Sequence, residues 1–186
     1  MTSKKYSLIW EKLEADGSKI YINFITIKFL HFFYFLIKGA ERPPGREGGI
    51  FVNIPEKNQY LLFSGVSLKR YSDVFIFDMN TRKWSKVNCT GAQPKDLCYA
   101  YGWYDKPNFF FYGGKNKELS LSDVYFLDTN KWLWKKVITI DQPLPRFYHA
   151  GAKVKDKSVY IYGGIHVGRT SKLLSDLHIY DYSKLY

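Results

Sequence analysis

Short apolar runs separated by turn residues dominate the chain from about residue 43 to its end. Three of the runs end in glycine, and each is followed by a second run that starts and ends with aspartate, as in Asp123-Val-Tyr-Phe-Leu-Asp128. Runs of this length, bounded by Gly, Pro, Asn and Asp, are typical of β-strands. In the best-defined unit we expect strands at about 97–104, 108–113, 123–128 and 132–138. The pattern therefore predicts an all-β protein made of four-stranded units.

The same landmarks recur at a nearly constant spacing. Gly65 and Gly114 are 49 residues apart, Asp73 and Asp123 are 50 apart, and Trp84 and Trp134 are 50 apart. A period of about 50 residues indicates a repeat protein whose units are equivalent pieces of structure. The full set of repeat landmarks is Gly65, Gly113, Gly114, Gly163, Gly164, Asp73, Asp123, Asp176, Trp10, Trp84 and Trp134.

Each landmark has a physical reason to recur. Glycine tolerates positive φ and leaves room for a neighbouring backbone at a sharp turn. The aspartates at the two ends of a run are expected to accept hydrogen bonds from local backbone amides. One tryptophan per unit, on the expected fourth strand, is large enough to fill the space between two stacked sheets.

These residues resemble the kelch repeat, over residues 43–186 and in a fragment near Trp10. The resemblance implies a β-propeller in which each repeat forms one four-stranded antiparallel blade. The expected fold class is all-β, with about three kelch-type blades in an incomplete ring. The chain departs from the pattern at Ser64, at Lys95-Asp96 where the other repeats have Arg46 or Arg146, and in repeat three, which stops before its tryptophan.

The expected organisation has five parts. Segment Ile9–Leu13 is similar to Lys83–Val87, a fourth strand, so it belongs to a preceding or closing blade. The parts are an N-terminal fourth strand (1–17), an apolar insertion (18–39), blade 1 (40–91), blade 2 (92–141) and blade 3 without its last strand (142–186).

Three blades fall short of a closed ring, because propellers have about 4–8 blades. We expect the chain to be part of a longer sequence. The alternatives are a ring that is completed by another chain and, less favoured, a small open stack. Closure of the last blade by the chain's own N-terminal strand is a further hypothesis, although a ring of three blades is sterically doubtful.

Residues 20–37 interrupt the repeat with a strongly apolar run. A transmembrane helix needs about 20 mostly apolar residues. A central lysine, here Lys28, costs about 2.5–3.5 kcal/mol on insertion. The run is rich in Ile, Phe, Tyr, Lys and Asn, which have A/T-rich codons. We interpret it as a retained intron that is read in frame, with a membrane segment and a genuine loop insertion as alternatives.

The net charge of the chain and the distribution of its lysines indicate which classes of molecule it binds. The chain has 28 Lys and Arg against 17 Asp and Glu, a net charge of +11. Its lysines are dispersed over all the repeats, whereas a nucleic-acid surface would cluster them, so we expect no nucleic-acid binding. The excess of positive charge favours acidic partners.

No enzymatic motif is found: the sequence lacks a phosphate-binding loop, a dinucleotide fingerprint and a nucleophile elbow. Four histidines and two cysteines show no metal-ligand spacing. We expect His149 to be a hydrogen-bonded structural histidine and His178 to be exposed on a strand. The chain is therefore predicted to be non-enzymatic, with no catalytic, cofactor or metal site.

The predicted function is a cytoplasmic platform for protein–protein interaction, in an adaptor or scaffold role. Recognition is expected on the loops between second and third strands, at 66–72, 115–121 and 165–174, because rigid scaffolds present function on loops. The candidate partner-binding residues are Lys69, Arg70, Lys115, Lys117, His166 and Arg169. A membrane-tethered kelch protein, and a fragment of a propeller enzyme whose active site lies elsewhere, are the alternatives.

Overall fold

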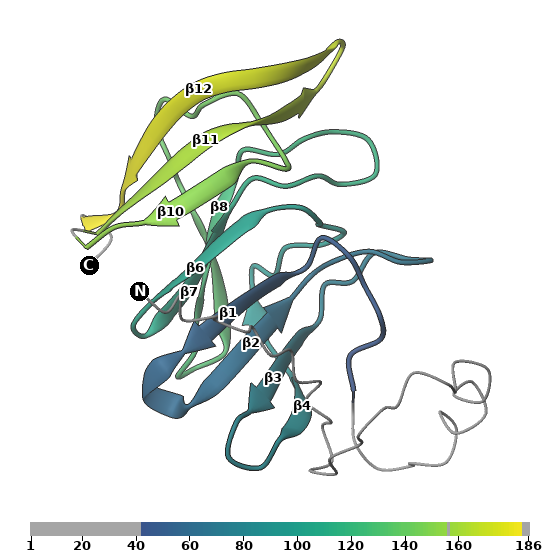
Figure 1. Cartoon of the computed structure of the whole chain (residues 1–186), viewed down its shortest axis with the longest axis vertical. Coiled ribbons are helices and arrows are strands. Elements are labelled where there is room, and N and C mark those ends of the chain that lie inside the picture. The colour runs from purple at the N-terminus through teal and green to yellow at the C-terminus, as the bar shows by residue number, and fades with distance from the viewer. Residues whose placement is uncertain (1–41, 156, 184–186) are drawn as a thin grey trace, which may run out of the picture.

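The computed structural model describes residues 42–155 and 157–183, and these form three sheets that follow one another along the chain (Figure 1). No α-helix occurs in this part of the chain. The predicted all-β fold made of repeated antiparallel units is confirmed, and the described sheets do not close into a ring. The expected N-terminal strand (1–17), with Trp10, and the apolar insertion (18–39) lie outside the described residues.

The first sheet is a four-stranded meander that starts close to the beginning of the described chain. Its strand order is β1-β2-β3-β4, and neighbouring strands are antiparallel. A short 3-10 turn, η2 (Pro55–Lys57), joins the first two strands. The strands are β1 (Ile50–Ile54), β2 (Gln59–Phe63), β3 (Val74–Asp78) and β4 (Lys83–Val87).

The second sheet repeats this arrangement and adds one short strand. Its order is β5-β9-β8-β7-β6, in which β5 is parallel to β9 and the other pairs are antiparallel. The strands are β5 (Thr90–Gly91), β6 (Tyr101–Asp105), β7 (Asn108–Tyr112), β8 (Val124–Asp128) and β9 (Leu133–Val137). Three of the four expected strands of this unit begin and end within one residue of the prediction, and the first begins four residues late.

The third sheet has three strands, β10 (Ala150–Lys153), β11 (Ser158–Val167) and β12 (Ser171–Asp181). β11 and β12 form a long hairpin whose pairing shifts between Tyr162 and Gly164 and then continues to Val167 opposite Ser171. The prediction of a loop at 165–174 is therefore wrong, since most of that segment is strand. The cause is its length: Asp123 and Asp176 are 53 residues apart instead of 50, and the additional residues pair across the hairpin.

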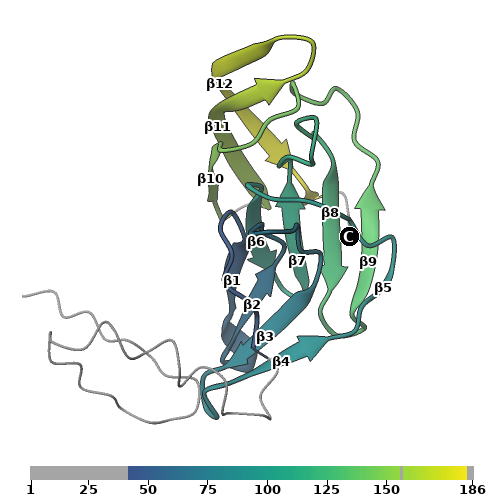
Figure 2. The same cartoon turned by 90° about the vertical axis from the view of Figure 1, so that its right-hand side faces the viewer.

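The first strands of the sheets lie on the inner side, where β6 packs between β1 and β10 (Figure 1). The sheets stack face to face, so each interface has its own apolar core. Trp134, 1% exposed, lies in the core between the first and second sheets. Turning the molecule by 90° shows β6–β9 between the other two sheets (Figure 2).

Candidate protein-interaction surface

The connections between second and third strands lie along one edge of the stack, on the right in Figure 1. We call residues 66–72, 115–121 and 165–174 the loop surface. Arg70 Nη2 donates a hydrogen bond of 3.0 Å to the Asn116 carbonyl, which ties the first connection to the second. Asn116 Oδ1 accepts hydrogen bonds from the amides of Glu118 and Leu119 and so shapes the second turn.

The second connection is tied to the third through a buried serine. Ser120 Oγ donates to the Val167 carbonyl at 3.1 Å, and the Val167 amide donates back to Ser120 Oγ at 2.9 Å. His166 Nδ1 lies 2.8 Å from the Pro145 carbonyl and 3.3 Å from Ser120 Oγ. The three connections therefore form one continuous surface, and His166 is partly used in holding it together.

Glycines with positive φ bend the chain just after β7 and at the register shift within β11. Gly114 has φ of +97° and Gly164 has φ of +98°. A Cβ on Gly164 would lie 2.8 Å from the Phe147 carbonyl oxygen, closer than real Cβ contacts. In the first sheet Ser64 takes the place of the first glycine and itself has φ of +62°.

The loop surface carries far more positive than negative charge. Glu118 is its one acidic residue. Within the described chain none of its lysines or arginines forms an ion pair. Leu68 is fully exposed and Leu173 is 80% exposed, which adds apolar contact area. The cationic residues are Lys69, Arg70, Lys115, Lys117, Arg169 and Lys172.

All six candidate partner-binding residues named from the sequence are at least partly exposed, and none of them is paired with a carboxylate within the described chain. Arg70 differs, because its guanidinium is used to join two connections. The Lys115 ammonium lies 5.1 Å from the centre of the Phe147 ring. Lys172 lies in the segment 165–174 where recognition was expected, but it is not among the named candidates; the structure places it, exposed, on β12.

Below the loop surface, two arginines repeat the same set of contacts. Arg46 binds Asp73 at 2.5 Å, and Arg146 binds Asp176 at 2.8 and 2.9 Å. Each guanidinium also donates to a backbone carbonyl, that of Ser64 just after β2 or that of Gly163 within β11. These bonds anchor the start of each repeat to the hairpin that carries its connection.

The second repeat has no such arginine, and Asp123 pairs instead with Lys136 at 2.8 Å. The expectation that both aspartates of each run bind local amides is therefore wrong for the first aspartate. It is right for the last one: Asp78 Oδ1 accepts from the amides of Asn80 and Thr81. Asp128 does the same in the second sheet.

His149 is buried, and neither of its ring nitrogens has a hydrogen-bond partner among the described residues. The expected hydrogen bond is absent because the ring packs against carbon: Tyr112 lies edge-on with ring centres 5.3 Å apart. Burial, and then the nearby Arg146 charge, lower the pKa of His149 to about 4. The ring is therefore neutral at pH 7. His178 is only partly exposed, and its Nε2 lies 2.7 Å from Asp176 Oδ2.

The remaining potential metal ligands and nucleophiles of the described chain do not form a recognisable site. Among residues 42–155 and 157–183, no three His, Cys, Asp or Glu side chains are placed to hold a metal ion. Burial raises the pKa of the Cys89 thiol to about 11 and also raises that of Cys98, so both are poor nucleophiles at pH 7. No helix long and apolar enough to cross a membrane is found in the described part of the chain.

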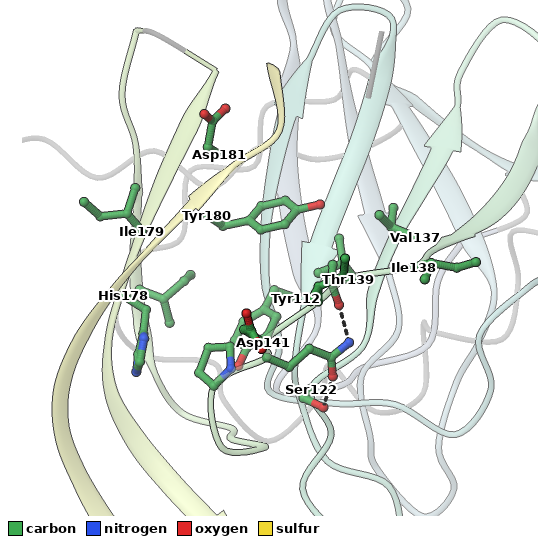
Figure 3. Close-up of a pocket in the computed structure, with 15 residues that line it drawn as sticks. Tyr112, Ser122, Val137, Ile138, Thr139, Asp141, His178, Ile179, Tyr180 and Asp181 are labelled. Carbon is green, nitrogen blue, oxygen red and sulfur yellow. Dashed lines mark hydrogen bonds between the residues drawn. The ribbon is translucent and has the colours of Figure 1, made fainter. Parts of the chain in front are cut away.

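One cavity of about 640 Å³ opens between the second and third sheets (Figure 3). Its walls are mainly apolar, with Tyr112, Val124 and Val137 on one side and Ile161 and Tyr180 on the other. Its rim is the segment 138–143. Here Gln142 accepts a hydrogen bond of 2.6 Å from Ser122 and donates one to Thr139. Three ionisable residues, Asp141, His178 and Asp181, also belong to its lining.

Comparison with known proteins agrees with this architecture. The family model described as the KLHDC2/KLHL20/DRC7 Kelch-repeats domain matches residues 32–185. The chain is 26% identical over 98 residues to Kelch domain-containing protein 1 of Mus musculus, which covers 51% of this chain and 24% of that protein.

Two further relatives carry different names. Dynein regulatory complex subunit 7 of Chlamydomonas reinhardtii is 32% identical over 115 residues, which are 58% of this chain and 10% of that protein. N-(sulfonatooxy)prop-2-enimidothioate sulfolyase of Thlaspi arvense is 31% identical over 105 residues, which are 52% of this chain and 29% of that protein. The matches span less than a third of the length of each of these relatives.

Proposed function

Because this chain belongs to the kelch-repeat family, we propose that it is a non-enzymatic adaptor or scaffold whose loop surface binds an acidic segment of another protein. The observation that carries the proposal is the excess of positive charge on three connections that hydrogen bonds join into one surface; none of these cations is in an ion pair within residues 42–155 and 157–183. A rigid surface loses little conformational entropy on binding.

The chemistry of the surface favours protein over small-molecule substrates. Exposed leucines such as Leu68 and Leu173 stand beside the cations, and this mixture suits a peptide with acidic and apolar side chains. The dispersed lysines elsewhere on the molecule would speed the encounter with such a partner through long-range attraction. A cytoplasmic location is consistent with the free thiols of Cys89 and Cys98.

Binding of a fluorescent ten-residue poly-glutamate peptide to the full chain tests the charge recognition. We expect saturable binding that weakens when salt is raised from 50 to 300 mM, as surface electrostatics require. The triple variant Lys69→Glu, Lys117→Glu, Arg169→Glu should bind the peptide at least about tenfold more weakly.

The matched control is Lys83→Glu, Lys131→Glu, Lys155→Glu, three exposed lysines outside the loop surface that give the same change of net charge. This control should change the dissociation constant by less than about threefold. Equal losses in both triple variants would mean that net charge, and not the loop surface, attracts the peptide.

A membrane role for residues 20–37 remains a separate prediction, since these residues lie outside the described chain. Resistance of the full chain to carbonate extraction from membranes, lost when 18–39 is deleted, is the expected result if that segment inserts.

A further inference from the structure

Two tyrosines border the loop surface just before the inner strands. Tyr99 lies two residues before β6, and Tyr148 lies two residues before β10. Cys98, which precedes the first tyrosine, exchanges two backbone hydrogen bonds with Lys115 of the second connection. The residue before the second tyrosine is bound to the third connection in the same way. Both tyrosines are therefore fixed along the inner border of the loop surface.

The backbone of both tyrosines has a conformation that favours glycine. φ is +60° at Tyr99 and +54° at Tyr148, and the equivalent residue of the first repeat is Gly48, with φ of +61°. The Tyr148 amide donates to the Tyr99 carbonyl at 3.2 Å, and the Tyr99 amide donates to the Gly48 carbonyl at 2.8 Å. Bulky residues with positive φ are strained, and strained residues cluster where proteins bind ligands. Glycine would avoid the strain, so the presence of tyrosine at two equivalent positions points to a use of the rings.

The two tyrosine rings form a cluster with Phe147, and we call these three residues the aromatic cluster. The ring centres of Tyr99 and Tyr148 are 4.2 Å apart, and those of Phe147 and Tyr148 are 5.1 Å apart. Phe147 is buried, whereas Tyr148 is 57% exposed. Tyr99 is partly exposed although its own sheet lies between the other two (Figure 2). The cluster therefore presents aromatic rings to solvent on a buried base.

Contacts hold the Tyr99 ring in one orientation. Its hydroxyl donates a hydrogen bond of 2.6 Å to Glu47 Oε1. This bond raises the pKa of Tyr99, so the phenol is protonated at pH 7 and remains the donor. The ring lies over Gly48, where a Cβ would clash with it. A ring that is already held in place loses little conformational entropy when a partner packs on it.

Charges of both signs lie around the aromatic cluster. The Lys115 ammonium is 5.1 Å from the centre of the Phe147 ring, and the exposed Lys117 follows on the same connection. The Glu47 carboxylate lies at the Tyr99 hydroxyl. A partner carboxylate beside Glu47 would be repelled, whereas carboxylates that reach the two lysines would be attracted. A neutral side chain is therefore favoured at the cluster, with acidic residues on its flanks.

We propose that the aromatic cluster binds an aromatic side chain of the partner protein, in a segment that carries acidic residues on both sides of it. This inference rests on the proposed function and specifies the partner segment further. Aromatic pairs gain from edge-to-face or offset contact in addition to the area they bury. Tyrosine is also among the residues that dominate binding at protein interfaces. The cations of the loop surface bind the flanking carboxylates.

Two fluorescent ten-residue peptides test this inference. Both contain nine glutamates, and they differ only in a central residue, which is tryptophan in one and alanine in the other. Fluorescence anisotropy with the full chain gives both dissociation constants. The tryptophan peptide should bind at least about fivefold more tightly than the alanine peptide.

The variants Tyr99→Gly and Tyr148→Gly each remove one ring and allow the positive φ without strain. Each should reduce the preference for tryptophan to less than about twofold. Neither should change the affinity for the alanine peptide by more than about twofold, because the cations remain. The matched control is Tyr162→Ala, which removes a tyrosine that is 54% exposed on β11 outside the loop surface and should keep the full preference.

Equal binding of the two peptides to the unchanged chain, or a preference for tryptophan that survives in both tyrosine variants, would overturn the aromatic contact and leave the charge recognition standing. Equal weakening of both peptides by the tyrosine variants would mean that the rings only support the fold of the surface, and it would overturn the contact too. If neither peptide binds the unchanged chain, the proposed function fails together with this inference.

Discussion

Arg146 donates two hydrogen bonds to the Asp176 carboxylate, from Nη1 to Oδ1 at 2.8 Å and from Nη2 to Oδ2 at 2.9 Å. The arginine side chain is completely buried, whereas the aspartate side chain is 42% exposed. The same guanidinium donates to the carbonyls of Gly163 and Leu144. The Arg146 side chain therefore connects the segment before β10 to both β11 and β12.

Replacement of this arginine should destabilise the protein. Arg146→Ala leaves the Gly163 carbonyl and the Asp176 carboxylate without their donor, and we expect the free energy of unfolding to fall by about 2 kcal/mol. That is less than the 3–5 kcal/mol typical of a fully buried pair, because water reaches Asp176. Urea denaturation measures the loss. Arg146→Lys should lose less, because it keeps the charge but not the paired bonds; equal losses would show that the geometry is unimportant.

His149 should make stability depend on pH between about 4 and 6.5. Its pKa is lowered to about 4 in the folded protein, first by burial and then by Arg146, while in the unfolded chain it stays near 6.5. The unfolded state then binds more protons in this window, so stability falls as the pH drops from 6.5 to 4 and levels off below. The total loss should be on the order of 3 kcal/mol.

The variant His149→Phe isolates this contribution. Phenylalanine fills the same apolar site beside Tyr112 but does not titrate, so the difference in unfolding free energy between variant and wild type should grow as the pH falls. Urea denaturation at pH 7, 5.5 and 4.5 gives the comparison. Parallel curves for the two proteins would contradict the assignment.

The two repeat tryptophans should differ in their contribution to stability. Trp134 is 1% exposed among Phe63, Phe109 and Phe111, so Trp134→Ala should cost about 4 kcal/mol. Trp84 is only half-buried, against Phe75 and Phe77 of its own sheet, so Trp84→Ala should cost less than half as much. Thermal unfolding compares the two, and equal shifts of the midpoint would be contrary to this ranking.

Ser64→Gly should stabilise the protein. Ser64 has φ of +62° and a buried hydroxyl for which no hydrogen-bond partner is found among the described residues. Glycine removes both penalties, and the gain should be about 1 kcal/mol after the greater entropy of the unfolded glycine chain is subtracted. Ser85→Gly, on the exposed part of β4, is the control and should be destabilising by about 0.5–1 kcal/mol. A loss of stability with Ser64→Gly would show that the hydroxyl is used.

The repeat period was enough to predict the fold class and most strands, because equivalent residues must occupy equivalent places in stacked units. It did not predict the length of the β11–β12 hairpin, since pairing beyond Gly164 depends on whether two flanking segments meet in register. Nor did it find the partners of Asp73 and Asp176: each lies opposite an arginine about 30 residues earlier, and only the turn of the chain brings the two together.

The sequence by itself determined the apolar alternation, the positions that need glycine and the one tryptophan per unit, because these are local requirements of strands, turns and sheet stacking. The tertiary structure alone decided that three separate connections join into one basic surface and that the His149 ring is buried without a hydrogen-bond partner among the described residues. Each of these depends on which side chains from distant residues come into contact, and contact is fixed by the packing of whole sheets.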